Sequence, residues 1–184
     1  MSGTDFRFSH DDLERAAQIV YRTLAPTPQF AWPLLATELG AEVWVKHENF
    51  TPTGAFKVRG GLVYFHELAA GGERPAGVIS ATRGNHGQSV GFAARRAGMR
   101  ATIVVPHGNS REKNAAMRAL GVKLIEHGAD FQESREYAAR LAAERNLHMV
   151  PAFHPHLVRG VASFSLELLR AVPELATVDR KSVV

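Results

Sequence analysis

The chain of 184 residues contains no cysteine. Its fold therefore relies neither on disulfides nor on thiolate metal ligands. A long uncharged apolar run is also missing, which argues against a membrane-spanning helix. The first ten residues lack the basic and then apolar layout of a secretory signal. We therefore expect a cytoplasmic protein that does not bind a membrane.

A strong excess of charge is absent as well. Lysine and arginine number 22 against 18 acidic residues, which gives a formal net charge of +4. The basic residues are dispersed, and only Arg95-Arg96 and Arg180-Lys181 are adjacent pairs. Dispersed charge of this size is typical of a solvated surface, so we expect no nucleic-acid partner.

The sequence does contain a regular alternation of short apolar segments and amphipathic segments. Strands are expected at residues 42–47, 78–80, 101–105, 122–125 and 148–153, and helices at 11–24, 56–70, 85–97, 111–120, 131–145 and 161–171. This alternation predicts an α/β fold, an open parallel sheet with helices on both faces. Residues 176–178 resemble the start of another strand, and the polar tail 179–184 makes the chain look cut.

Lys57 is the first residue that points to chemistry. A turn containing Gly54 precedes it, Phe56 adjoins it, and Gly60-Gly61 permit close approach of another backbone. At a helix start in a partly apolar pocket, the pKa of the amine is expected to be lowered, and the neutral amine can form a Schiff base or act as a base. The alternative is a solvated lysine on an exposed turn.

The second candidate is the segment 80–88, which follows an expected strand and opens an expected helix. The carboxyl end of a parallel strand is a usual place for ligands, and exposed N–H groups there favour an anion. Thr82, Asn85 and His86 add donors. The alternative is a plain helix start with glycine for chain geometry. Because the glycine spacing does not fit G-x-G-x-x-G, an NAD site is disfavoured.

Together, the segments around Lys57 and Gly84-Asn85-His86 resemble the fold-type II family of pyridoxal-phosphate enzymes, most closely its threonine/serine dehydratase branch. A hydroxyectoine-utilisation type of dehydratase is one candidate within that branch. The resemblance covers about residues 25–175 and includes Lys46-His47-Glu48-Asn49, Val105-Pro106 through Lys113 to Gly121, Pro151-Ala152-Phe153 and Gly160-Val161-Ala162-Ser163.

The resemblance implies that Lys57 holds pyridoxal 5′-phosphate covalently, with Phe56 beside its ring and Asn85 bonded to its 3′ oxygen. Thr82, Asn85 and His86 would hold the carboxylate of a small amino-acid substrate. The freed Lys57 amine would take the Cα proton. Loss of the β-hydroxyl from threonine, serine or a similar substrate would then give a 2-oxo acid and ammonia.

Arg83 departs from the family pattern. It stands where related dehydratases tend to carry alanine and where related racemases carry a serine that acts as an acid. Because Arg83 has no hydroxyl, it argues against racemisation. A guanidinium there is able to bind a second carboxylate or a polar substrate tail. The alternative is a side chain that points outward into solvent.

The resemblance also implies a division of the chain into parts. Residues 1–50 would begin a large cofactor domain, 51–150 would form a small α/β domain, and 151–184 would start the remainder of the large domain. The family's glycine-rich phosphate loop would lie beyond Val178. We therefore expect this chain to be an incomplete form of an enzyme that is a homo-oligomer at full length.

Two other functions are compatible with the sequence. One is a β-replacement synthase of the same fold, which release of a 2-oxo acid from threonine without sulfide would argue against. The other is a non-catalytic fragment, which would stay colourless when the cofactor is added.

Several remaining residues favour structural roles. His154 and His156 are close in sequence, but no third ligand is evident, so a polar loop around Pro155 and no metal site are expected. Trp32 and Trp44 are expected to serve in packing and not as substrate platforms. Residues 149–151 are expected in the core.

Overall fold

The computed structural model describes residues 7–72 and 75–179. The helices in this part of the chain are α1 (His10–Tyr21), α2 (Pro33–Leu39), α3 (Lys57–Ala70), α4 (Asn85–Arg96), α5 (Arg111–Ala119), α6 (Phe131–Arg145) and α7 (Pro155–Ala171), with a 3-10 turn η1 (Glu48–Phe50). The strands are β1 (Gln29–Ala31), β2 (Trp44–Lys46), β3 (Val78–Ala81), β4 (Ala101–Val105), β5 (Lys123–Glu126) and β6 (His148–Met149).

The last four of these strands form one parallel sheet in the order β5-β4-β3-β6. Val78 pairs with Ala101 and with His148, and Thr102 pairs with Lys123. Every residue of β3 is buried, as expected for an apolar strand in the middle of a covered parallel sheet. The expected α/β fold with a parallel sheet is therefore confirmed.

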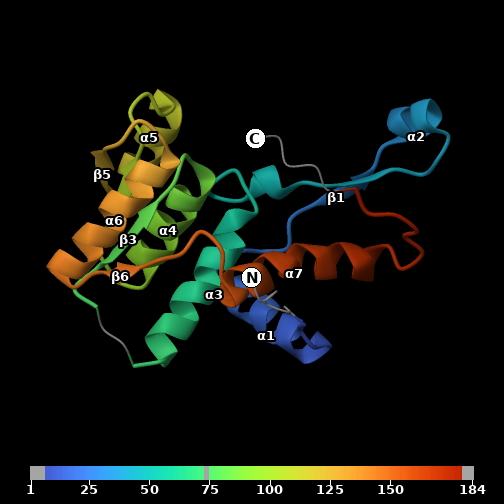
Figure 1. The fold of residues 1–184 in the computed structure, drawn as a ribbon. Coiled ribbons are helices and arrows are strands. Elements are labelled where there is room, and N and C mark those ends of the chain that lie inside the picture. The colour runs from blue at the N-terminus through green and yellow to red at the C-terminus, as the bar shows by residue number, and fades with distance from the viewer. Residues whose placement is uncertain (1–6, 73–74, 180–184) are drawn as a thin grey trace.

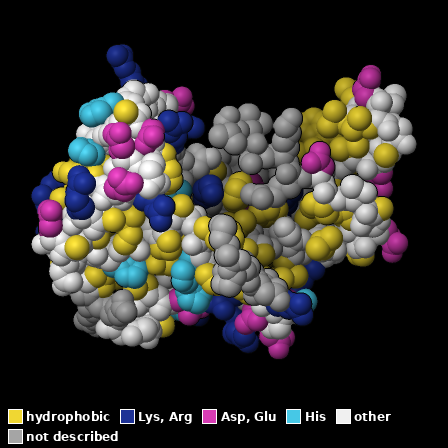
Figure 2. Space-filling model, viewed as in Figure 1, with side chains coloured by type: hydrophobic (Ala, Val, Ile, Leu, Met, Phe, Trp, Pro, Cys, Tyr) yellow, Lys and Arg dark blue, Asp and Glu magenta, His cyan; other side chains and the backbone are white. Residues whose placement is uncertain are grey.

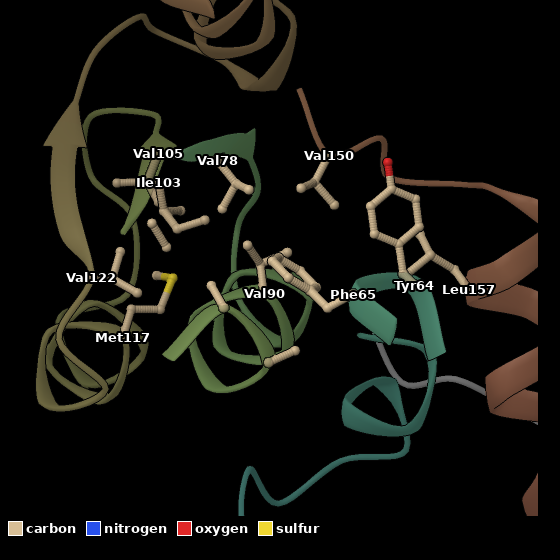
Figure 3. Packing of buried hydrophobic residues seen from close by; sticks show 13 residues of the cluster. Tyr64, Phe65, Val78, Val90, Ile103, Val105, Met117, Val122, Val150 and Leu157 are labelled. Atoms are coloured by element: carbon tan, nitrogen blue, oxygen red, sulfur yellow. The ribbon is translucent and has the colours of Figure 1, made fainter. Parts of the chain in front are cut away.

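Helices cover both faces of this sheet (Figure 1). On one face, α4 and α5 with part of α3 enclose a core that includes Phe65, Val90, Ile103 and Met117 (Figure 3). On the other face, α6 packs Ala138 and Leu141 against Ile79 and Val104, among others. The β-branched strand residues fill the space between the layers and hold the carboxyl ends of β3 and β4 in fixed positions.

We call the parallel sheet with α4, α5 and α6 the sheet unit. A second group of helices, α1, α3 and α7, packs beside it (Figure 1). Its core is formed by Ala16, Val20, Leu24, Val58, Leu62 and Val63. Where α7 crosses α3, Gly160 lies against the backbone of Arg59 and Gly60, so the two helices approach closely. This crossing positions the first turn of α3, where the candidate lysine lies.

The segment of β1, α2 and β2 extends away from the rest of the described chain as an arm (Figure 1). β1 and β2 form an antiparallel pair, and no residue of α2 is buried. Hydrophobic side chains are exposed over this arm (Figure 2), and they include Phe30, Trp32, Leu34, Leu35 and Leu39. Trp32 is exposed on this arm, with its ring centre 6.0 Å from that of His47, and Trp44 is half-buried.

Three differences from the sequence expectations lie in the C-terminal part of the chain. α7 begins at Pro155, six residues before 161, because His154 caps it and proline suits its first position. β6 is shorter than expected, since Pro151 has no N–H to continue the ladder. Residues 176–178 form no strand. The remainder of the tail, with Arg180-Lys181, lies outside the described residues, and no described helix has the length and apolar character needed to cross a membrane.

Candidate active site

Lys57 is the first residue of α3 and follows a tightly bonded turn. The Thr51 hydroxyl accepts a hydrogen bond from the Ala55 N–H and donates one to the Ala55 carbonyl, both at 2.9 Å. Gly54 has a φ of 64°, the left-handed conformation that glycine adopts without strain. From α4, the Ser89 hydroxyl donates to the Lys57 carbonyl at 2.6 Å. The lysine backbone is therefore fixed from two sides.

A cavity of about 270 Å³ opens beside this lysine. It lies between the start of α3, the start of α4, the segment after β6 and the first turns of α7. Its lining residues are Phe56, Lys57, Gly60, His86, Ala152, Phe153, Leu157, Val158 and Val161. The Lys57 amine also lies 5.5 Å from the centre of the Phe56 ring. An amine in a mostly apolar concave site is a usual setting for covalent chemistry.

His86 is the second polar side chain of this cavity. It is 8% exposed, and its Nε2 atom has no hydrogen-bond partner among the described residues. Burial, and to a lesser degree the charge of Lys57, lowers the pKa of His86 to about 4. The imidazole is therefore neutral at neutral pH. A buried nitrogen without a partner is costly, and a bound ligand would satisfy it.

Two of the helices that meet at the cavity, α3 and α4, begin without side-chain caps. The residues before them, Phe56 for α3 and Gly84 for α4, accept no hydrogen bond from the first turn through a side chain. By contrast, Ser9, Ser110, Asp130 and His154 cap α1, α5, α6 and α7. Two long helices thus leave first-turn N–H groups without a side-chain cap at the same place, where the helix dipoles favour an anion.

The loop before α4 carries the other predicted residues. Thr82 is buried, and its hydroxyl accepts a hydrogen bond from the Gly84 N–H at 3.1 Å. Arg83 and Asn85 are exposed. The Lys113 side chain lies over Gly84, where a Cβ atom would be 3.4 Å from the Lys113 amine. This glycine therefore leaves room for a cation beside the loop.

The structure thus brings together Phe56, Lys57 and His86, which line one cavity. Thr82, Arg83 and Asn85 lie on the adjoining loop and are not among the lining residues. The pairing of Lys57 with the Asn85 amide across a common cleft stays a prediction.

Sequence reasoning missed a buried charge cluster next to the site. Arg59 is fully buried and donates to both oxygens of Glu48, at 2.7 and 2.9 Å, and to both oxygens of Glu167, at 2.6 and 3.0 Å. Its remaining bonds go to Ser163 at 3.0 Å and Thr27 at 3.3 Å. One available signal in the sequence was that Arg59 is the only charged residue in the otherwise mostly apolar run 58–65.

The charges of this cluster are balanced. Lys46 forms a second ion pair with Glu167 at 2.6 Å. Burial raises the pKa of Glu167, but the hydrogen bonds from Arg59 and Lys46 outweigh it and hold this pKa below its ordinary value. Two basic and two acidic side chains are therefore paired with one another in the interior.

His154 and His156 lie with His148 around Tyr64 and a smaller cavity of about 200 Å³. The His148 ring bonds the Tyr64 hydroxyl at 2.8 Å, and His154 caps α7. These contacts give the His148 and His154 rings structural roles. Within residues 7–72 and 75–179, no three His, Asp or Glu side chains are placed to hold a metal ion.

Comparison with known proteins defines the class. Residues 20–182 match the family described as "Pyridoxal-phosphate dependent enzyme". This match spans most of the chain, so the chain belongs to the family of pyridoxal-phosphate dependent enzymes. The threonine dehydratase IlvA of Haemophilus influenzae is 34% identical over 157 residues, which cover 85% of this chain and 30% of that protein.

Solved structures agree with this class. The processed form of threonine deaminase isoform 2 from Solanum lycopersicum has a TM-score of 0.79 and 28% identity, with 91% of this chain and 50% of that chain covered. A pyridoxal 5′-phosphate-dependent aspartate racemase has a TM-score of 0.87 and 27% identity, with 93% of this chain and 54% of that chain covered. The chain therefore spans about half of these structures and a smaller share of the curated relative.

The described residues fit the family's cofactor. Lys57 supplies an amine, the starts of α3 and α4 favour a phosphate or a carboxylate, and His86, whose Nε2 has no hydrogen-bond partner among the described residues, lines the same cavity. Pyridoxal phosphate supplies an electron sink for bonds broken at an amino-acid Cα when it is bound.

Proposed function

We propose that this chain carries the lysine-bearing half of an ammonia-lyase site that acts on threonine, serine or a similar β-hydroxy amino acid. The observation that supports this most strongly is the cavity shared by Lys57 and His86 at the start of α4. The names of the relatives, which include threonine dehydratases and an L-threonine ammonia-lyase of Thermotoga maritima, favour this chemistry over β-replacement. The similarity to an aspartate racemase concerns the fold and does not decide between the reactions.

Each residue has a defined task in the proposed reaction. Lys57 Nζ would bind the cofactor, and after its release it would take the proton from the substrate Cα. Phe56 would pack on the cofactor ring, and Asn85 would bond its 3′ oxygen. Thr82, Asn85, His86 and the N–H groups of the loop would hold the substrate carboxylate. His86 would act as a neutral hydrogen-bond partner because burial keeps its pKa near 4.

Arg83 would set the substrate range in this proposal. Its side chain is exposed beside Thr82 and Asn85, where a guanidinium would meet the far end of a bound substrate. A second carboxylate, as in a hydroxyaspartate-like molecule, would bind there in a bidentate manner.

The domain division, the oligomeric state and the cellular location of the enzyme belong to the same proposal. We propose that residues 1–50 and 151–184 contribute to a large cofactor domain and 51–150 form the small domain. The sheet unit and the exposed arm support this division. A homo-oligomeric full-length form and a cytoplasmic location are also proposed, although relatives from two yeasts carry "mitochondrial" in their names.

The first test is attachment of the cofactor. Pyridoxal 5′-phosphate is added to the chain, visible absorbance is recorded, and borohydride reduction is followed by peptide mapping. We expect one label, on Lys57, and its loss in Lys57→Ala. Lys123→Ala serves as the matched control because Lys123 is exposed on β5, away from the cavity. Label spread equally over surface lysines in all three proteins would contradict the proposal.

The second test is turnover. Threonine and serine are supplied without sulfide, and 2-oxo acid and ammonia are measured. We expect Lys57→Ala to lower the rate by at least about 10²-fold, the usual share of a general base. Label on Lys57 without any 2-oxo acid would show a cofactor-binding chain that lacks lyase activity.

A further inference from the structure

The charge cluster around Arg59 joins four separate segments next to the proposed site. Arg59 lies on α3, Glu48 in η1, Glu167 on α7 and Lys46 on β2. All five N–H donors of the guanidinium are used, because four bind the two carboxylates, each through both oxygens, and the fifth donates to the Ser163 hydroxyl. Such a double bidentate bridge fixes the position and rotation of the guanidinium.

The first turn of α3 needs such a fixation. Phe56 provides no side-chain cap, and a backbone bond from the Arg59 N–H to the Phe56 carbonyl, at 3.1 Å, closes the turn. Arg59 and Lys57 are two positions apart, so they project from nearly opposite sides of the helix. A rotation of the turn that frees Arg59 from its carboxylates would also turn Lys57 away from its present direction.

We propose that Arg59 is a positioning residue, whose bridge between Glu48 and Glu167 holds the first turn of α3 so that Lys57 faces His86 across the cavity. The inference rests on the proposed function of Lys57. Arg59 itself takes no part in the reaction, since it is fully buried and does not line the cavity.

The matched pair of variants is Arg59→Lys and Arg159→Lys. Lysine keeps the charge at position 59, but it cannot bind two carboxylates through a planar fork. Arg159 also joins α7 to α3, through Glu67, but at the other end of α3. Both variants therefore weaken an ion pair between the same two helices, and only the first disturbs the turn with Lys57.

The readout that needs no cofactor is the His86 pKa, followed by NMR of its ring during a pH titration. Burial, and to a lesser degree the charge of Lys57, holds this pKa at about 4 in the native arrangement. We expect Arg59→Lys to raise it by on the order of one unit toward the ordinary value of histidine. Arg159→Lys should leave it unchanged. An unchanged His86 pKa in folded Arg59→Lys would overturn the inference.

The second readout is attachment of pyridoxal 5′-phosphate to Lys57, measured by visible absorbance. We expect the attachment rate of Arg59→Lys to fall by about 10²-fold, the usual effect of a misplaced reacting group, and that of Arg159→Lys to stay native. If the wild type binds no cofactor but His86 responds to Arg59→Lys, the proposed function fails and the positioning role stands.

A milder variant covers the case in which Arg59→Lys does not fold. Ser163→Ala removes one hydrogen bond to the guanidinium and leaves every charge of the cluster in place. The same two readouts should move in the same direction by a smaller amount. A native His86 pKa together with native attachment in this variant and failure of Arg59→Lys to fold would mean a purely structural role.

Discussion

The sheet unit and the arm of β1, α2 and β2 use similar apolar residues in opposite ways. In β3 of the sheet unit, Val78 and Ile79 are fully buried. In the arm, Leu34 is 81% and Leu39 is 68% exposed. The hydrophobic effect therefore stabilises the first region directly and gives the second almost nothing in this chain.

This difference shows where the candidate site obtains its rigidity. The loop with Thr82 follows a strand buried on both faces, so its position is fixed by packing. The arm is tied to the rest by polar contacts instead, chiefly the Lys46–Glu167 ion pair and the bond from Lys46 to the Thr27 carbonyl at 2.6 Å. The two regions should respond differently to the same substitution.

The largest expected effect comes from a matched pair of leucine truncations. Leu141 on α6 is 4% exposed and packs on the sheet, whereas Leu34 on α2 is largely exposed. Leu141→Ala should lower the free energy of unfolding by about 2–5 kcal/mol through lost burial and a cavity. Leu34→Ala should change it by less than about 0.5 kcal/mol. Urea titration measures both, and similar losses for the two variants would erase the distinction between the regions.

Acid should destabilise the sheet unit through His86. The folded chain binds a proton at this residue only near pH 4, while the unfolded chain binds it near the ordinary value of 6.5. The unfolded state therefore holds more protons between these values, and the free energy of unfolding decreases as pH falls from 6.5 toward 4. The free energy of unfolding lost over this pH range amounts to about 3 kcal/mol.

Denaturant titrations across this pH range provide the test. His86→Gln should flatten the pH dependence, whereas His66→Gln, at an exposed position of α3, should keep the native slope. His154 and His156 contribute in the same direction, because burial lowers their pKa values as well. A native slope in His86→Gln would show that the His86 ring does not titrate as its burial implies.

The sheet and the cavity were predictable because their signals are local. Apolar β-branched runs define β3 and β4, and Lys57 and His86 each lie in a short segment with turn and glycine signals. The Arg59 cluster was not predictable, since it joins residues up to 108 positions apart. The start of α7 was missed for a different reason. Pro155 between two histidines favours a loop in the sequence, although proline at a first helical position is also a start signal.

The smallest effect tests the crossing that connects the two regions. A Cβ atom at Gly160 would lie 2.6 Å from the Arg59 carbonyl oxygen and 2.9 Å from the Gly60 Cα, so α7 would have to move away from α3. Gly160→Ala should cost about 1–3 kcal/mol, as overpacking usually does. Gly71→Ala is the control, because its Cβ would meet no atom closer than 3.5 Å.

The same substitution should also loosen the arm, because Glu167 on α7 holds Lys46 of β2. Amide hydrogen exchange would show this as faster exchange in β1 and β2 of Gly160→Ala, with β3 and β4 unchanged. Equal protection of the arm in both glycine variants would mean that its position does not depend on α7. In that event the polar contacts, and not the helix crossing, would control how the arm is held against the rest of the described chain.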